Sequence, residues 1–212
     1  MTANAKDTFH EIIVLTDKTT ELMETFGTFP PSEQEAVLGD AFETAIGNLG
    51  DDDEVPITLV RCAEMLVGVM TENVVKTLTA GLAHGNPTVR LLSGDAITHI
   101  AEENLELLKP AIDEVLKEGS GAAEEMPFIL SEIDDPEVFG LLERFLAHES
   151  GEVVASAIEA LIEIGDPQAI DAIQQLTSDT REVTVDDELG GGEKTTVGQL
   201  AKDALEILEE EE

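Results

Sequence analysis

The sequence predicts an all-α protein, an α-solenoid of stacked antiparallel helical pairs. The stretch IEALIEIGDPQAIDAIQQL (158–176) carries two apolar stripes at i, i+3 and i+4 spacing, which is typical of two amphipathic helices. Thirty-one residues earlier, ILSEIDDPEVFGLLERFL (129–146) repeats the arrangement around a second Asp-Pro. Self-similarity at this period indicates a solenoid, because each unit can bury its apolar face only against its neighbours.

Three consecutive residues separate the two helices of the 158–176 stretch. Gly165 suits the left-handed conformation that ends a helix, Asp166 suits an N-cap, and Pro167 suits the first helical position. Asp135 and Pro136 occupy the same places in the preceding unit. We therefore expect a tight turn, with almost no loop, between the helices of each pair.

The ends of the second helices allow the units to be counted. The motifs LAHG, LKEG, LAHE and LTSD recur at intervals of 34, 30 and 30 residues. Residues 53–180 are thus expected to hold about four helical pairs, each with an outer helix, a tight turn and an inner helix. The predicted pairs span 55–84, 87–118, 122–149 and 152–178.

These repeats resemble the short HEAT-like repeats first recognised in phycobilin lyases. The best match lies at 153–176, and the resemblance covers 86–178 well and 55–85 less closely. It implies a HEAT-like or armadillo-type superhelix that binds a partner on a concave surface made by the inner helices. It also implies an alternative function, that of a bilin (phycocyanobilin) lyase-like tetrapyrrole chaperone. The sequence argues against this alternative, because it has no Trp or Tyr to line a pigment pocket.

Residues 1–52 carry no repeat motif and are predicted to form a helical hairpin. Ser32 and Glu35 have the spacing of a capping box, and Gly50 suits the end of the second helix. We expect this hairpin to cap the exposed apolar face of the first repeat. A dedicated partner-binding module is the alternative.

Residues 181–212 interrupt the helical pattern. Val183 and Val185 alternate with polar residues before an acidic, Gly-rich segment, which fits either a small hairpin or a mobile loop. A C-terminal capping helix, TVGQLAKDALEIL (196–208), is expected to follow. The sequence GGGEKTT lacks the glycine before the lysine that a phosphate-binding loop needs, so a Gly-rich turn is favoured.

The charge of the chain excludes several classes of partner. Its formal net charge is −36, from 47 acidic and 11 basic side chains, and its only aromatic residues are seven Phe. The electric field of this negative charge repels nucleic acids and anionic membranes. The sequence has no long apolar run and no signal-peptide core, so we expect a cytoplasmic protein. The composition resembles that of proteins from salt-loving archaea. The resemblance implies that the chain has a role like those of haloarchaeal HEAT-like proteins, which include signalling, such as taxis.

No catalytic, cofactor-binding or metal-ligating set stands out, so the sequence predicts a protein that is not an enzyme and uses no cofactor. Cys62 lies among apolar residues at helical spacing, which predicts a buried, inert thiol. His84 and His148 share a position at the end of second helices, but two repeats separate them. A capping role is therefore expected rather than a shared metal ion.

The predicted function is that of a non-enzymatic adaptor that binds another protein on its concave face. Lys76, Lys117 and Arg144 are basic residues placed among acids on inner helices, where they could anchor partner carboxylates or form local ion pairs. A structural homo-oligomer assembled through the N-terminal hairpin is a third alternative. The candidate interaction surface consists of Lys76, Asp113, Lys117, Glu137, Arg144, Asp171, Gln174 and Gln175.

Overall fold

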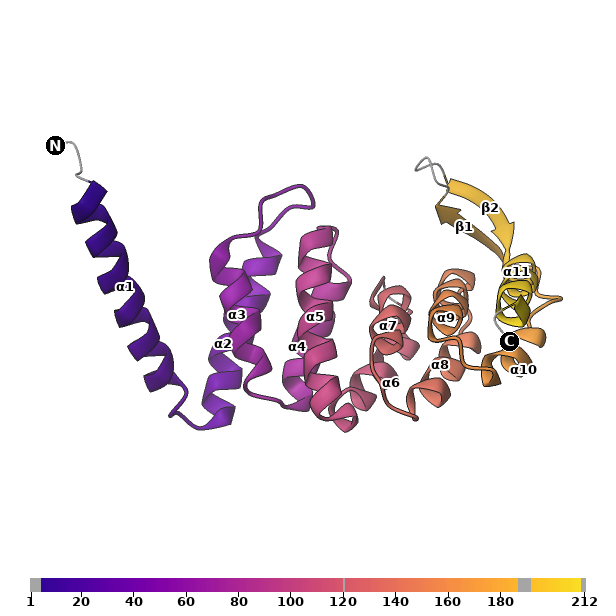
Figure 1. Ribbon diagram of the computed structural model, residues 1–212, viewed down its shortest axis with the longest axis horizontal. Coiled ribbons are helices and arrows are strands. Elements are labelled where there is room, and N and C mark those ends of the chain that lie inside the picture. The colour runs from indigo at the N-terminus through magenta and orange to yellow at the C-terminus, as the bar shows by residue number, and fades with distance from the viewer. Residues whose placement is uncertain (1–4, 120, 187–191, 211–212) are drawn as a thin grey trace.

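A computed structural model of the 212-residue chain describes residues 5–119, 121–186 and 192–210. Helices follow one another along most of this length, and one short antiparallel hairpin interrupts them near the C-terminus (Figure 1). The helices are α1 (Ala5–Phe26), α2 (Pro31–Gly47), α3 (Ile57–Val67), α4 (Glu72–Leu82), α5 (Pro87–Glu103), α6 (Lys109–Glu118), α7 (Gly121–Ser131), α8 (Val138–Leu146), α9 (Gly151–Ile164), α10 (Gln168–Gln174) and α11 (Val197–Glu210). A 3-10 turn, η1 (Leu105–Leu107), precedes α6, and the strands are β1 (Glu182–Asp186) and β2 (Gly192–Thr196).

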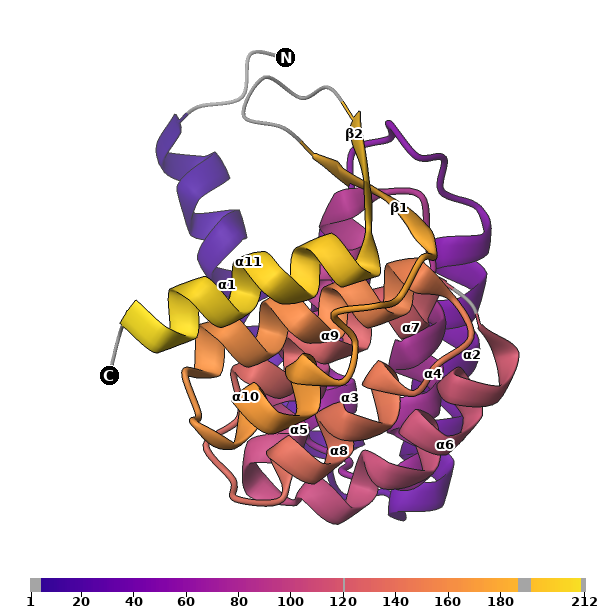
Figure 2. The ribbon, with the colours of Figure 1, turned by 90° about the vertical axis from the view of Figure 1, so that its right-hand side faces the viewer.

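The helical pairs stack side by side in two layers. In the first layer α3 packs on α5, α5 on α7, α7 on α9 and α9 on α11. In the second layer α4 packs on α6 and α8 on α10, and ion pairs join α6 to α8. Figure 2 looks along this stack, with α11 and α9 above α10 and α8. The predicted all-α solenoid is confirmed.

The Asp-Pro turns have the same local structure in two successive units. The backbone N–H of Gln168 donates to the Asp166 carboxylate, and that of Glu137 donates to the Asp135 carboxylate, both at 2.8 Å. Gly165 is left-handed, with φ +66°, and its N–H donates to the carbonyls that end α9, as predicted. The second helix begins at Gln168, one residue later than expected, because Pro167 forms the N-cap.

Most of the core lies between the two layers and is continuous along the stack. At one point the layers come unusually close, where Gly81 of α4 faces Ser93 of α5 and Phe42 of α2, all three of which are buried. A Cβ at position 81 would overlap the Ser93 hydroxyl oxygen and would lie 3.0 Å from the Ser93 Cβ. Only a glycine fits here without moving a helix.

The two N-terminal helices have different relations to the stack. Helix α2 packs on α3 and α4 and buries Leu38, Phe42 and Ile46, so it covers the apolar face of the first repeat. Helix α1 diverges from α2 and makes few contacts with any other described element (Figure 1). The covering expected of a helical hairpin is therefore provided by α2 alone.

The predicted start and end of α2 were wrong. Pro30 is the N-cap and Pro31 begins the helix, which places Ser32 inside the first turn, where its side chain makes no cap. The Glu35 carboxylate instead accepts hydrogen bonds from the Thr71 hydroxyl and the Asn73 side-chain amide, at 2.6 and 2.9 Å. The helix ends at Gly47, before the predicted Gly50. Glu35 thus ties α2 to the N-cap of α4 rather than capping its own helix.

The C-terminal segment contains the hairpin that the sequence allowed as one alternative. Strands β1 and β2 are antiparallel, with Thr184 opposite Lys194, while the Gly-rich residues 187–191 lie outside the described part of the chain. Helix α11 packs on α9 and α10, with Ala204 and Leu208 buried. Within the described residues, no helix combines the length and the apolar character needed to cross a membrane.

Candidate interaction surface

The solvent-exposed sides of α4, α6, α8 and α10 form one surface, which we call the second-helix face. All eight residues of the predicted interaction surface are exposed on it or at its edge. Helix packing brings together those on α4, on α6 and on or just before α8, whereas no ion pair between described residues joins the three at α10 to them. The first group is Lys76, Asp113, Lys117, Glu137 and Arg144, and the α10 group is Asp171, Gln174 and Gln175.

Basic residues on this face form ion pairs between neighbouring repeats. The Lys76 ammonium on α4 lies 2.9 Å from the Glu114 carboxylate on α6. From α8, Arg144 reaches back to Asp113 on α6. The hydrogen bond from Arg144 lowers the pKa of the Asp113 carboxyl, and the bond to Glu114 raises the pKa of the Lys76 ammonium.

A further pair joins the starts of two second helices. The Lys109 ammonium lies 2.7 Å from the Glu137 carboxylate, and it also contacts Glu106 in the turn before α6. These two hydrogen bonds raise the pKa of Lys109. Lys109 is not among the residues predicted from the sequence, because it stands at the very start of its helix. The side chains of these pairs are exposed or half-exposed to solvent, so each pair contributes little to stability.

Of the two roles foreseen for the cations on this face, local ion pairing is the one observed for Lys76 and Arg144. Lys117 is different, since it makes no ion pair with any described side chain. Its charge nevertheless contributes to lowering the Asp113 pKa. Lys117 is therefore the basic residue of this set that is left to meet an external carboxylate.

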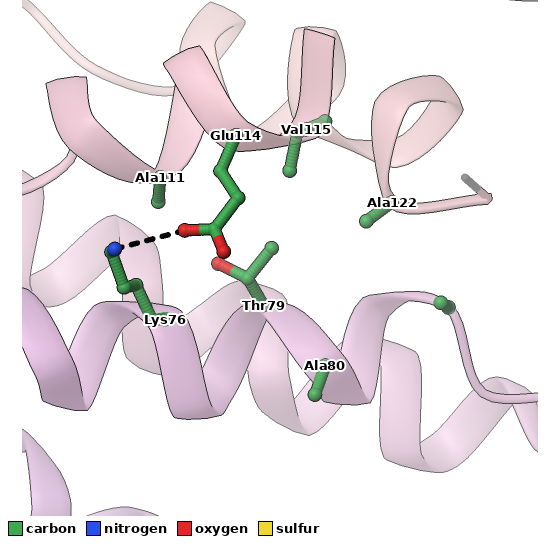
Figure 3. A pocket seen from close by; sticks show the side chains of 8 residues that line it. Lys76, Thr79, Ala80, Ala111, Glu114, Val115 and Ala122 are labelled. Atoms are coloured by element: carbon green, nitrogen blue, oxygen red, sulfur yellow. Dashed lines mark ion pairs between the residues drawn. The ribbon is translucent and has the colours of Figure 1, made fainter. Parts of the chain in front are cut away.

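A groove with a volume of about 360 Å³ lies on the second-helix face between α4 and α6. Its walls are mostly small side chains, and the Lys76–Glu114 ion pair spans it at one end (Figure 3). The lining residues are Lys76, Thr79, Ala80, Ala83, Ala111, Glu114, Val115 and Ala122. The groove exists because alanines occupy positions where larger apolar residues would close the gap between the helices.

A second hollow follows at the next junction, between α6 and α8. It has a volume of about 590 Å³ and is lined in part by Lys117, Arg144 and His148. The two hollows lie one repeat apart along the same face. The first is lined mostly by small apolar side chains, with the Lys76–Glu114 ion pair at one end, whereas the second carries Lys117, Arg144 and His148 together with one acid, Glu149. The face can therefore accept an apolar group and an acidic group at consecutive positions.

The two histidines at the ends of second helices close turns. The Nδ1 atom of His84 accepts the backbone N–H of Asn86 at 2.9 Å, and Nδ1 of His148 accepts that of Ser150 at 3.1 Å. The Arg90 guanidinium donates to the His84 carbonyl, and the Arg181 guanidinium does so to the His148 carbonyl. Both rings accept a backbone N–H group of the following turn. Because Nδ1 of His84 accepts, its Nε2 donates to the Ile46 carbonyl at the end of α2, at 3.1 Å. The described residues hold no cluster of three or more ligating side chains.

The Cys62 thiol is buried against α2. Its Sγ atom lies 3.3 Å from the Leu38 carbonyl, to which the S–H donates. Burial raises the pKa of the thiol, because it disfavours the charged thiolate. The prediction of a buried thiol is confirmed.

This burial predicts a specific pH dependence of stability. The thiol of the unfolded chain ionises near pH 8.5, whereas the pKa of the folded thiol is raised. The contribution to stability is therefore fully present below about pH 8.5 and is lost as the pH rises above that value. The urea midpoint should fall between pH 8 and pH 10, and the fall should be smaller in Cys62→Ala. An equal fall in both proteins would contradict this, and the sequence has no Tyr to complicate the measurement.

Part of the repeat region is similar to a known family of repeats. Residues 117–186, about a third of the chain, match the family model for HEAT repeats. This range runs from the end of α6 to β1 and includes both Asp-Pro turns. No curated protein matches the chain. Residues 117–186 are thus similar to HEAT repeats, and they form part of the all-α solenoid described above.

Proposed function

We propose that this chain is a non-enzymatic adaptor that binds another protein along the second-helix face. HEAT repeats commonly serve as protein-interaction scaffolds, because stacked second helices present a long continuous surface. The observation that carries the proposal is the succession of two hollows at the α4–α6 and α6–α8 junctions. Two of the alanines that line the first hollow, Ala80 and Ala83, are exposed and leave it open to solvent.

The chemistry of the two hollows defines what the partner presents. The first hollow has an apolar lining apart from Thr79 and the ion pair at its end, so it fits an aliphatic or aromatic side chain. In the second, Lys117 is free to meet a carboxylate. We therefore propose a partner segment that carries an apolar residue followed, about one repeat spacing away, by an acidic residue.

Filling the first hollow should weaken binding of the partner. Ala80 is an exposed helix residue on the groove wall, so Ala80→Leu adds volume to the groove without disturbing the core. We expect a loss of affinity of at least tenfold for a partner that is recovered stoichiometrically with the wild-type chain. Affinity is measured by calorimetry with the purified partner, in molar KCl.

The matched control is Ala41→Leu, because Ala41 is likewise an exposed alanine within a helix. This variant should bind as the wild type does. Equal affinity of Ala80→Leu and wild type, with unchanged circular dichroism, would remove the α4–α6 groove from the binding surface.

We propose that the acidic composition is an adaptation to high cytoplasmic salt, as in salt-loving archaea, and that the adaptor serves signalling, with taxis as one pathway. The tetrapyrrole alternative receives no support from the groove, since no aromatic side chain lines it. Addition of bilin with an unchanged absorption spectrum would dispose of that alternative.

A further inference from the structure

A second apolar groove lies at the opposite end of the molecule from the hairpin, between α1 and α3. It has a volume of about 430 Å³, and its lining is almost wholly apolar. Leu22 is 59% exposed and Phe29 is 48% exposed, although both are large apolar residues. The lining residues are Thr19, Leu22, Met23, Thr25, Phe26, Phe29 and Met65.

The apolar surface continues along α1 beyond the groove. Ile13, Val14 and Leu15 are between 43% and 56% exposed, so the described part of this helix presents apolar side chains without a covering element. An exposed apolar surface of this kind marks an interaction site, because leaving it in water is unfavourable. The proposed adaptor function does not use it, since the second-helix face is built from other helices.

The groove has a defined shape because its base is fixed. The Gln34 side-chain amide donates to the carbonyls of Gly27 and Phe29, at 3.3 and 2.7 Å, which holds the turn between α1 and α2. The rings of Phe26 and Phe29 pack against each other with centroids 6.1 Å apart. The C-terminal end of α1 is thus anchored, while the rest of the helix diverges from the stack (Figure 1).

Charge decides between the possible occupants. Three exposed acids, Glu21, Glu24 and Glu64, directly adjoin groove-lining residues in the sequence, against one exposed base, Lys18, so the surroundings of the groove are acidic on balance. A second copy of the chain would bring its own Glu21, Glu24 and Glu64 to this surface, and like charges in close contact repel one another even where salt screens the long-range field. An anionic membrane would be repelled for the same reason. A helix with an apolar stripe and basic flanks would complement both the groove and its rim.

We propose that the α1 groove binds an amphipathic helix of a partner protein, in which basic residues flank an apolar stripe. The apolar stripe packs on Leu22, Phe29 and Met65, and the basic residues face the acids beside them. This site is separate from the second-helix face, so the chain can hold two different partner segments at once.

The test uses the full chain and three fluorescein-labelled 20-residue peptides. The first carries Leu at heptad positions a and d and Lys elsewhere, the second has the same composition in scrambled order, and the third carries the same Leu stripe with Glu in place of Lys. Fluorescence anisotropy is measured in 0.5 M KCl, which suppresses long-range attraction of the basic peptides. The first peptide should bind at least tenfold more tightly than the other two.

Variants locate the binding site. Leu22→Ser should weaken binding of the first peptide at least tenfold, whereas Leu91→Ser should leave it unchanged, since Leu91 is an equally exposed leucine on α5. Ala80→Leu should also leave it unchanged, which separates this site from the second-helix face. Equal binding of the scrambled peptide or of the acidic peptide would overturn the proposal. It would also be overturned by light scattering that shows a wild-type dimer and a Leu22→Ser monomer, because the occupant would then be a second copy.

Discussion

Replacing Gly81 with alanine should destabilise the folded chain by about 1–3 kcal/mol, the usual effect of overpacking a core. In an ordinary helix the same change would stabilise by about 1 kcal/mol, because glycine is a poor helix former. At Gly81 the new Cβ would overlap the Ser93 hydroxyl oxygen and would lie 3.3 Å from the Phe42 ring. Helices α4 and α5 must then move apart, and urea denaturation measures the loss.

Gly140 provides the matched control within the same fold. It lies in α8, is exposed, and has no atom within 4 Å of the place where a Cβ would stand. Gly140→Ala should therefore stabilise by up to about 1 kcal/mol, the opposite sign from Gly81→Ala. The double variant Gly81→Ala, Ser93→Gly removes the overlapping atoms and should recover part of the loss. A stabilising Gly81→Ala would show that α4 and α5 are not in close contact.

The melting temperature should rise by about 6–12 °C between 0.1 and 2 M KCl. The net charge of −36 destabilises the compact state by self-repulsion, which salt screens. For a chain of this length 1 kcal/mol corresponds to about 2–4 °C, so the rise corresponds to relief of about 3 kcal/mol of repulsion. Salt also weakens the exposed ion pairs such as Lys76–Glu114, but such pairs contribute little. Differential scanning fluorimetry measures the rise.

The shape of the salt response identifies its cause. Screening is largely complete once the Debye length has fallen to about 3 Å, near 1 M, so the curve should be steep at first and then level off. A steady linear rise would instead indicate exclusion of salt from the protein surface. Replacing KCl with KNO3 at equal ionic strength should preserve the early rise. A flat response would contradict the proposed adaptation to high salt.

The turn chemistry of the repeats could be predicted because it is local. Gly165, Asp166 and Asp135 act through their own backbone and that of the next few residues, so their roles follow from sequence order alone. The Ser32–Glu35 capping box failed even though it is also a local pattern. Two prolines before it had already set the start of the helix, and Glu35 found partners in α4.

The candidate surfaces could be predicted only in part. Lys76 and Arg144 were found because cations are rare in this chain, but their partners Glu114 and Asp113 depend on how neighbouring repeats are staggered. The α4–α6 groove exists because small side chains leave space between the helices. A single alanine such as Ala80 looks the same in the sequence whether it lines a groove or packs tightly against a neighbour. For residues 1–52 the sequence left a partner-binding module as the alternative to a cap. It could not indicate that the apolar residues of α1 stay exposed, since their periodicity resembles that of a core helix.

The main contacts between repeats join neighbours in the stack, and this allows the molecule to bend along its length. A small change in angle at each junction adds to the next, so a solenoid of this kind bends as a spring does. If two partners are bound at the α1 groove and on the second-helix face, the distance between them then depends on how far the solenoid is bent. Tension between those partners would change the angles at the helix junctions that lie between the two sites.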